Sequence, residues 1–172
     1  MKLIVQIPCL NEQYTLPQVI ADIPRKIDGI DKVEILVIDD GSIDRTVEVA
    51  KELGVDHIIR NKQTIGLAKS FSLGLDKCLK EGAEIIVNTD GDNQYPGQDI
   101  HKLIQPILQE RADIVVCDRQ TSKIPHFSKQ KKLLQKIGSH VVKKLSGLNI
   151  PDAVSGFRAF NKKAAIKLNI IS

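Results

Sequence analysis

The chain has few aromatic residues: no Trp, two Tyr and four Phe among 172 residues. Its core must therefore be built mostly from Ile, Val and Leu, the other large apolar residues that proteins bury. Surfaces that bind nucleic acid stack bases on aromatic side chains interleaved with basic ones. Because the basic part of this chain lacks interleaved aromatics, we predict that nucleic acid is not a partner.

Cysteines and long apolar runs are also scarce. Cys9, Cys78 and Cys117 are odd in number and have no CxxC spacing, which fits small buried hydrophobes in a reduced, cytosolic compartment. The longest apolar runs are too short to cross a bilayer, and the N-terminal stretch MKLIVQIPCLNE turns polar too early for a signal peptide. We therefore expect neither a membrane span nor a secretion signal in this sequence.

Acidic residues are absent between Arg119 and Pro151. Eight of the 25 Lys and Arg residues lie in this stretch, which leaves 17 basic against 21 acidic residues elsewhere, so the net charge of +4 is a local feature. A local basic patch indicates an anionic partner. The eight basic residues are Arg119, Lys123, Lys129, Lys131, Lys132, Lys136, Lys143 and Lys144.

The same stretch contains SKQKKLLQKIGSHVVKKLSG, a pattern that predicts an amphipathic helix with lysines around an apolar stripe. A basic amphipathic helix can lie on an anionic membrane surface, and we predict that residues 123–145 dock there. The alternative is that the stripe packs into the core and the lysines face water. The stripe consists of Leu133, Leu134, Ile137, Val141 and Leu145.

Five runs rich in Val and Ile predict strands at residues 2–8, 34–40, 56–61, 83–90 and 112–119. Helical patterns lie between them, at residues 16–27, 44–53, 67–79 and 99–110. Continuous apolar runs suit strands covered on both faces, as in a parallel sheet. The alternation predicts a single α/β domain over residues 1–172, with a mainly parallel, Rossmann-like sheet and flanking helices.

Local signals refine these boundaries. Thr15 is placed to act as an N-cap, with Pro17 in the first turn of the helix and Pro24 near its end. Gly54 is expected to stop the second helix. After the basic stretch, DAVSGFRAF predicts a further strand, and a short helix follows near Lys162.

Polar clusters follow four of the predicted strands: PCLNE, DDGS, DGDNQ and DR. Because ligands of open α/β sheets bind beyond the carboxyl ends of the strands, we expect these clusters to converge on one edge. Asp90, Asp92 and Gln94 present carboxylate and amide oxygens, which suit Mg²⁺ or Mn²⁺ shared with substrate phosphates. Turn formation by Asp and Gly explains any single cluster, but explains several less well.

Four motifs in order resemble the family 2 glycosyltransferases with the GT-A nucleotide-diphospho-sugar fold, in particular the dolichol-phosphate mannose synthase and polyprenyl-phosphate glycosyltransferase branch. The motifs are PCLNE, VIDDGSIDRT, DGDNQYP and VSGFR, and the likeness extends from residue 3 to about residue 168. Leu10 stands where such proteins often have Tyr, and Gly91 where they often have Ala. Because such proteins usually continue further, the resemblance implies a catalytic domain truncated at its C-terminus.

The resemblance implies a role for each matching residue. It places Pro8, Leu10 and Glu12 beside the nucleoside of the donor, with Ile38 and Asp40 on base and ribose. It gives Arg119 a donor-binding role. The set implied for the divalent cation and the donor diphosphate is Asp90, Gly91, Asp92 and Gln94.

Asp92, Asp152 and Arg158 are the candidate catalytic residues. The resemblance implies an inverting transfer of a hexose from a GDP-mannose-type or UDP-glucose-type donor to a polyprenyl phosphate, at the cytoplasmic face of the membrane. One alternative is a sugar-hydroxyl acceptor, which needs a carboxylate base such as Asp152. Another is a non-catalytic nucleotide-sugar-binding domain. Arg158 could instead pair with a structural carboxylate, and the sequence leaves the oligomeric state open.

Overall fold

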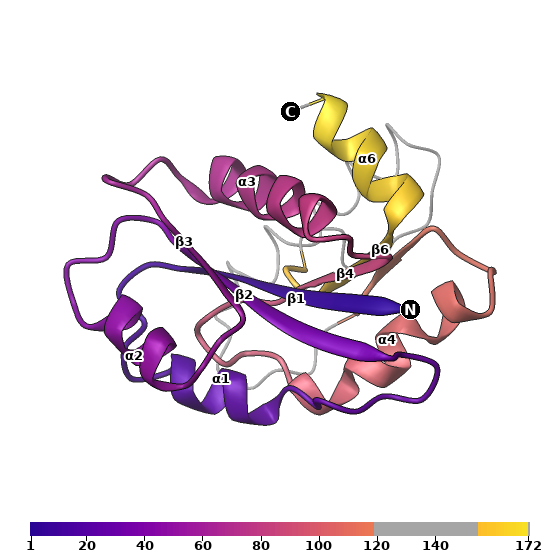
Figure 1. Ribbon diagram of the computed structural model, residues 1–172, viewed down its shortest axis with the longest axis horizontal. Coiled ribbons are helices and arrows are strands. Elements are labelled where there is room, and N and C mark those ends of the chain that lie inside the picture. Colours follow the sequence, from indigo (N-terminus) through magenta and orange to yellow (C-terminus); the bar gives the residue numbers. More distant parts are fainter. Residues whose placement is uncertain (119–154, 172) are drawn as a thin grey trace, which may run out of the picture.

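The structure is a computed structural model that describes residues 1–118 and 155–171, with side chains through Leu168 (Figure 1). Within these residues, six strands form one sheet, in the order β3-β2-β1-β4-β6-β5. The strands are β1 (Lys2–Cys9), β2 (Lys32–Asp39), β3 (His57–Arg60), β4 (Ile85–Asn88), β5 (Ile114–Val116) and β6 (Arg158–Asn161). The helices are α1 (Leu16–Asp22), α2 (Thr46–Glu52), α3 (Leu67–Lys80), the 3₁₀ turn η1 (Gly97–Asp99), α4 (Ile100–Leu108) and α6 (Lys162–Ile171).

The central strands are parallel, as the apolar runs predicted. β1 pairs in parallel with both β2 and β4, and β2 pairs in parallel with β3. Leu3 is aligned with Val33 on one side and with Ile85 on the other. All but the first residue of β1 and of β2 are buried, so the sheet is covered on both faces. The predicted mainly parallel α/β architecture is confirmed.

β6 enters the sheet antiparallel, between β4 and β5. The sequence predicted a strand in DAVSGFRAF, and the helix after it, but not the position of that strand in the sheet. The register places Arg158 opposite Asn88, at the carboxyl end of β4. The late VSGFR motif is thereby brought next to the DGDNQ motif, about 65 residues away in the chain.

Helices cover both faces of the sheet, with α3 and α6 on one face and α1, α2 and α4 on the other (Figure 1). Along each central strand, successive side chains point to opposite faces of the sheet. Ile4 and Leu36 pack toward α3 with Leu75, whereas Val5 and Ile35 belong to the larger cluster on the other face. The edge where β1, β2 and β4 end is left for ligands.

The helix boundaries follow backbone chemistry. α1 ends at Asp22 because Ile23, which precedes Pro24, adopts an extended conformation. Gly54 follows α2 with a positive φ of 65°, as predicted. Thr15 occupies the N-cap position of α1, as predicted, but its backbone is helical and its side chain makes no cap hydrogen bond. The Thr15 hydroxyl instead donates to Glu12 Oε2, at 2.5 Å.

A buried ion network lies at the amino end of the sheet, away from the polar clusters. Glu34 is 3% exposed, and its oxygens lie 2.7 Å from Lys2 Nζ, 2.6 Å from Lys32 Nζ and 2.8 Å from His57 Nε2. Burial alone would raise the pKa of this carboxyl. The hydrogen bonds from Lys2, Lys32 and His57 outweigh burial and lower the pKa from 4.5 to about 2.

Glu34→Gln is expected to lower the free energy of unfolding by about 2 kcal/mol at pH 7. Because the pKa of Glu34 is lower in the folded state, its ionised carboxylate stabilises the fold above pH 4.5, the pKa of the unfolded state. This stabilisation is lost as the pH falls toward 2. The melting temperatures of variant and wild type, measured from pH 7 to pH 3, should therefore converge in acid. Glu52→Gln, which removes an exposed ion pair with Arg45, is the control. A constant difference across this range would contradict the assignment.

Candidate functional site

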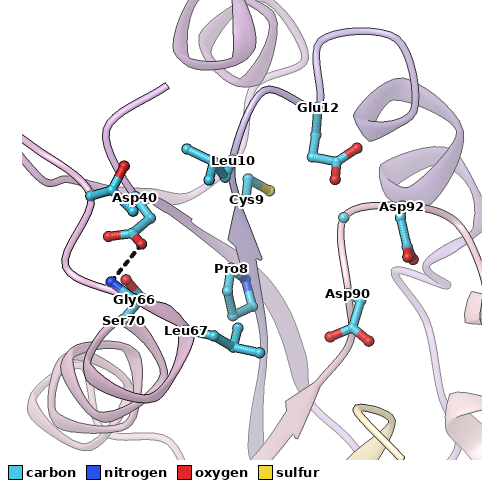
Figure 2. A pocket seen from close by; sticks show the side chains of 12 residues that line it. Pro8, Cys9, Leu10, Glu12, Asp40, Gly66, Leu67, Ser70, Asp90 and Asp92 are labelled. Atoms are coloured by element: carbon cyan, nitrogen blue, oxygen red, sulfur yellow. Dashed lines mark hydrogen bonds between the residues drawn. The ribbon is translucent and has the colours of Figure 1, made fainter. Parts of the chain in front are cut away.

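The carboxyl ends of β1, β2 and β4 border a cavity of about 380 Å³, which we call the edge cavity. Seven predicted site residues line it, and they come from three separate motifs. Asp40 lies on one side and the two aspartates after β4 on the other, with Pro8 between them (Figure 2). The expected convergence therefore occurs for three of the four clusters. The seven residues are Pro8, Leu10, Glu12, Asp40, Asp90, Gly91 and Asp92.

The loop after β1 is held by the loop after β2. Asn11 has a positive φ of 58°, its N–H donates to Ser42 Oγ at 2.8 Å, and its side-chain oxygen accepts from Ile43 N–H at 3.0 Å. The N–H of Glu12 donates to Thr46 Oγ1 at 2.8 Å. The small polar residues of DDGSIDRT thus position the PCLNE loop at the cavity.

Asp40 is only 6% exposed, and its carboxylate organises the start of α3. One oxygen accepts from Asn61 Nδ2 at 2.9 Å and from Ile65 N–H at 3.0 Å, and the other from Gly66 N–H at 2.9 Å. Burial opposes ionisation, but these donors and Ser70 together lower the pKa of Asp40. No local sequence pattern indicates this anchoring, because it depends on a loop that starts 21 residues further on, at Asn61.

Asp40→Ala is expected to lower the free energy of unfolding by about 1–2 kcal/mol, because it leaves two part-buried N–H groups, of Ile65 and Gly66, without their acceptor. We also expect weaker nucleoside binding whether or not metal is present, since α3 begins at the cavity wall. Denaturant unfolding and calorimetry with a nucleoside test both effects. Asp76→Ala removes a half-exposed carboxylate from α3 and serves as the control. A loss of binding seen only with metal would place Asp40 in a cation site instead.

The acidic side of the cavity follows β4. Asp92 Oδ2 accepts from Gln94 Nε2 at 2.6 Å and Asp92 Oδ1 from Gln94 N–H at 3.2 Å, so these two side chains act together. A Cβ on Gly91 would lie 3.0 Å from Cys9 Sγ, which shows how closely this loop approaches the β1 loop. Within residues 1–118 and 155–171, no three His, Cys, Asp or Glu side chains form a metal cluster. Two carboxylates and an amide form a partial set of hard-oxygen ligands, which fits a cation that also binds phosphate oxygens.

Gly156 lies directly against Asp90. A Cβ at Gly156 would sit 2.7 Å from Asp90 Cγ and closer still to its oxygens. The N–H of Gly156 donates to the Tyr95 hydroxyl at 2.9 Å, and its carbonyl accepts from Asn88 Nδ2 at 2.8 Å. Tyr95 in turn stacks on Phe157, with ring centroids 5.4 Å apart. The absence of a side chain at Gly156 therefore sets the position of Asp90. In the sequence, the glycine of the SGFR motif was the only sign of this role.

The remaining predicted site residues have other positions. Ile38 is fully buried in the cluster beneath α3. Arg158 begins β6, and its Nε donates to the carbonyl of Ser155 at 2.5 Å. Arg119 and Asp152, like residues 123–145, lie outside the described residues. Cys9 lines the edge cavity, but burial, with help from Glu12, raises the pKa of its thiol so far that it stays protonated.

Comparison with known proteins agrees with this geometry. The model of the family described as glycosyl transferase family 2 matches residues 4–168. The UDP-N-acetylglucosamine–dolichyl-phosphate N-acetylglucosaminyltransferase of Methanococcus voltae is 31% identical over 178 residues, covering 92% of this chain and 68% of that protein. The dolichol-phosphate mannosyltransferase of Pyrococcus furiosus is 32% identical over 182 residues, covering 99% of this chain and 50% of that protein.

Solved structures share the fold. The glucosyl-3-phosphoglycerate synthase of Mycobacterium tuberculosis, in complex with Mn²⁺, UDP and glucosyl-3-phosphoglycerate, superposes with a TM-score of 0.71 at 23% identity. The match covers 94% of this chain and 57% of that one. This chain therefore spans between half and about two thirds of the length of these three proteins.

Proposed function

The chain belongs to glycosyl transferase family 2, and on this premise we propose that it moves a hexose, with inversion, from a nucleotide-diphospho-sugar to a polyprenyl phosphate. One observation carries the proposal. The carboxylates of Asp90 and Asp92 line the same cavity as Pro8 and the Asp40-anchored start of α3. A nucleoside and a diphosphate joined in one molecule need two such sides within one cavity.

The donor lies across the edge cavity. The nucleoside, of the GDP-mannose or UDP-glucose type, occupies the side of Pro8, Leu10 and Asp40, and the diphosphate lies toward Asp90 and Asp92. Mg²⁺ or Mn²⁺ held by Asp90, Asp92 and Gln94 would act as a Lewis acid on the leaving diphosphate. The mycobacterial synthase was solved with Mn²⁺ and UDP bound, which supports a divalent cation and a nucleoside diphosphate as the groups that bind in this cavity.

The acceptor determines which further groups the chemistry needs. In the proposed reaction an acceptor phosphate oxygen bonds to the anomeric carbon while the bond from that carbon to the diphosphate oxygen breaks. The phosphate is already anionic, so no side chain has to remove a proton. A sugar hydroxyl would need a carboxylate base, and Asp152 stays the candidate for that alternative. The dolichyl-phosphate acceptors in the names of both curated relatives favour the phosphate.

A polyprenyl phosphate resides in a membrane, so the domain has to reach one. In residues 1–118 and 155–171, no helix is long and apolar enough to cross a bilayer. We propose that residues 123–145 attach the domain to the cytoplasmic face. This proposal rests on their sequence, in which lysines surround an apolar stripe.

Wild-type protein should co-sediment with phosphatidylglycerol vesicles, and salt should weaken this binding, because each Lys near such a surface contributes about 1 kcal/mol that ions screen. The Lys129/Lys131/Lys132→Glu variant should bind much less. Lys26/Lys51/Lys163→Glu makes the same charge change at exposed positions and is the control. Equal sedimentation of the two variants would rule out docking through residues 123–145.

The transfer reaction itself is tested with the full-length protein in detergent, each labelled sugar nucleotide and a polyprenyl phosphate. We expect label in the lipid fraction with one donor, and we expect EDTA to abolish it. Label transferred only to an oligosaccharide would support the hydroxyl alternative. Donor binding without transfer to any acceptor would support a non-catalytic domain.

A further inference from the structure

A second cavity, of about 590 Å³, adjoins the edge cavity. It lies between α3 and α6, which share one face of the sheet (Figure 1). Leu67 and Asp90 line both cavities, so a molecule in the second cavity would be adjacent to the donor diphosphate. We call this second cavity the α3–α6 groove.

The two ends of the groove differ in chemistry. Toward one end, the wall of the groove is apolar and is formed by Leu67, Phe71 and Leu75 of α3 and by Leu168 of α6. Its other end, at the carboxyl edge of β4 and the start of β6, carries Asp90 and Arg158. Such a groove matches a ligand that is apolar along most of its length and polar or charged at one end.

The apolar wall is fixed in place yet accessible. Phe71 is held edge-to-face by the buried Phe160, with ring centroids 5.9 Å apart and planes at 65°. Leu67, in contrast, is 66% exposed at the first position of α3. Leu67 therefore presents an apolar surface where the two cavities meet, and a ligand in the groove would cover it.

We propose that the α3–α6 groove holds the first isoprene units of the acceptor, with the acceptor phosphate at the Arg158 end. This inference rests on the proposed function and adds the place where the lipid binds. The Arg158 guanidinium supplies positive charge for the phosphate. The acceptor phosphate then lies beside Asp90, which lines the edge cavity as well. A polyol acceptor would find few hydrogen-bonding partners along the wall of α3.

Filling the groove tests the proposal. Ala68, on the wall, is exposed, so Ala68→Trp adds bulk without opening the core. In full-length protein, we expect the KM for polyprenyl phosphate to rise about 10-fold or more, with the donor KM unchanged. Ala21→Trp makes the same change at an exposed position of α1, on the opposite face of the sheet, and should leave both constants unchanged.

A polyprenyl phosphate with a photoreactive diazirine in its first isoprene unit provides a second readout on wild-type protein. We expect cross-links to peptides containing residues 67–75 or 162–171. A higher donor KM in Ala68→Trp would make the groove the hexose pocket, and unchanged constants or cross-links elsewhere would also overturn the proposal. If wild type transfers sugar to lipid and these results fail, only the groove assignment is lost. If wild type transfers none, the proposed function itself fails.

Discussion

Gly156→Ala is expected to lower turnover about 100-fold in a protein that remains folded, because misplacing a catalytic group by about 1 Å can cost that much. The new Cβ would lie 2.7 Å from Asp90 Cγ, so the carboxylate has to move. The side chain of Asp90 lies after the end of β4 and borders the edge cavity, so its carboxylate can move without unfolding the sheet. The apparent affinity for Mn²⁺ in the transfer assay should fall together with turnover.

Gly97→Ala is the matched control for this prediction. A Cβ there would lie 2.9 Å from the backbone of Asp22, in a crowded place away from the edge cavity. That variant should lose stability while its dependence on Mn²⁺ stays unchanged. If Gly156→Ala kept both its turnover and its Mn²⁺ dependence, the glycine would not set the position of Asp90.

Asp92→Asn is expected to reduce turnover by about 100-fold to 1,000-fold, the range found when one group that stabilises transition-state charge is removed. The substitution keeps the size of the side chain and an oxygen that can accept from Gln94 N–H, so the loop after β4 should keep its shape. It removes the negative charge that a divalent cation requires. The gain in nucleotide affinity that Mn²⁺ brings should therefore disappear.

Asp99→Asn provides the comparison for Asp92→Asn. Asp99 lies at the end of η1, is half-exposed, and pairs with the exposed Lys102 at 2.6 Å. Its amide variant should bind nucleotide and metal like wild type, since an exposed pair contributes little. Equal effects of the two substitutions would mean that general electrostatics, and not a bound cation, explains the result at Asp92.

The sequence was sufficient to predict the central parallel strands and the convergence of the polar loops that follow them. β1, β2 and β4 are continuous apolar runs, and such runs specify strands covered on both faces. Parallel strands end at the same edge, so residues after β1, β2 and β4 had to meet there. Pro8, Asp40 and Asp92 could therefore be assigned to one cavity from local patterns alone.

Contacts between distant segments could not be predicted in this way. Asp40 was expected to face a nucleoside, yet its oxygens bind N–H groups of a loop more than 20 residues further along the chain. Gly156 matters only because β6 inserts beside β4, and no periodicity reveals strand order. Thr15 has the residue type of an N-cap but binds Glu12 instead, because a nearby carboxylate competes with the helix end.

Titration of UDP and of GDP into the wild-type chain, with Mn²⁺ and with EDTA, tests most directly whether the edge cavity binds a nucleotide diphosphate through a shared cation. We predict that one nucleotide binds about 10-fold or more tightly with Mn²⁺ than with EDTA, because the diphosphate and the chain each supply part of the coordination shell. Equal affinity for that nucleotide under both conditions, or no binding of either nucleotide with Mn²⁺, would contradict the account.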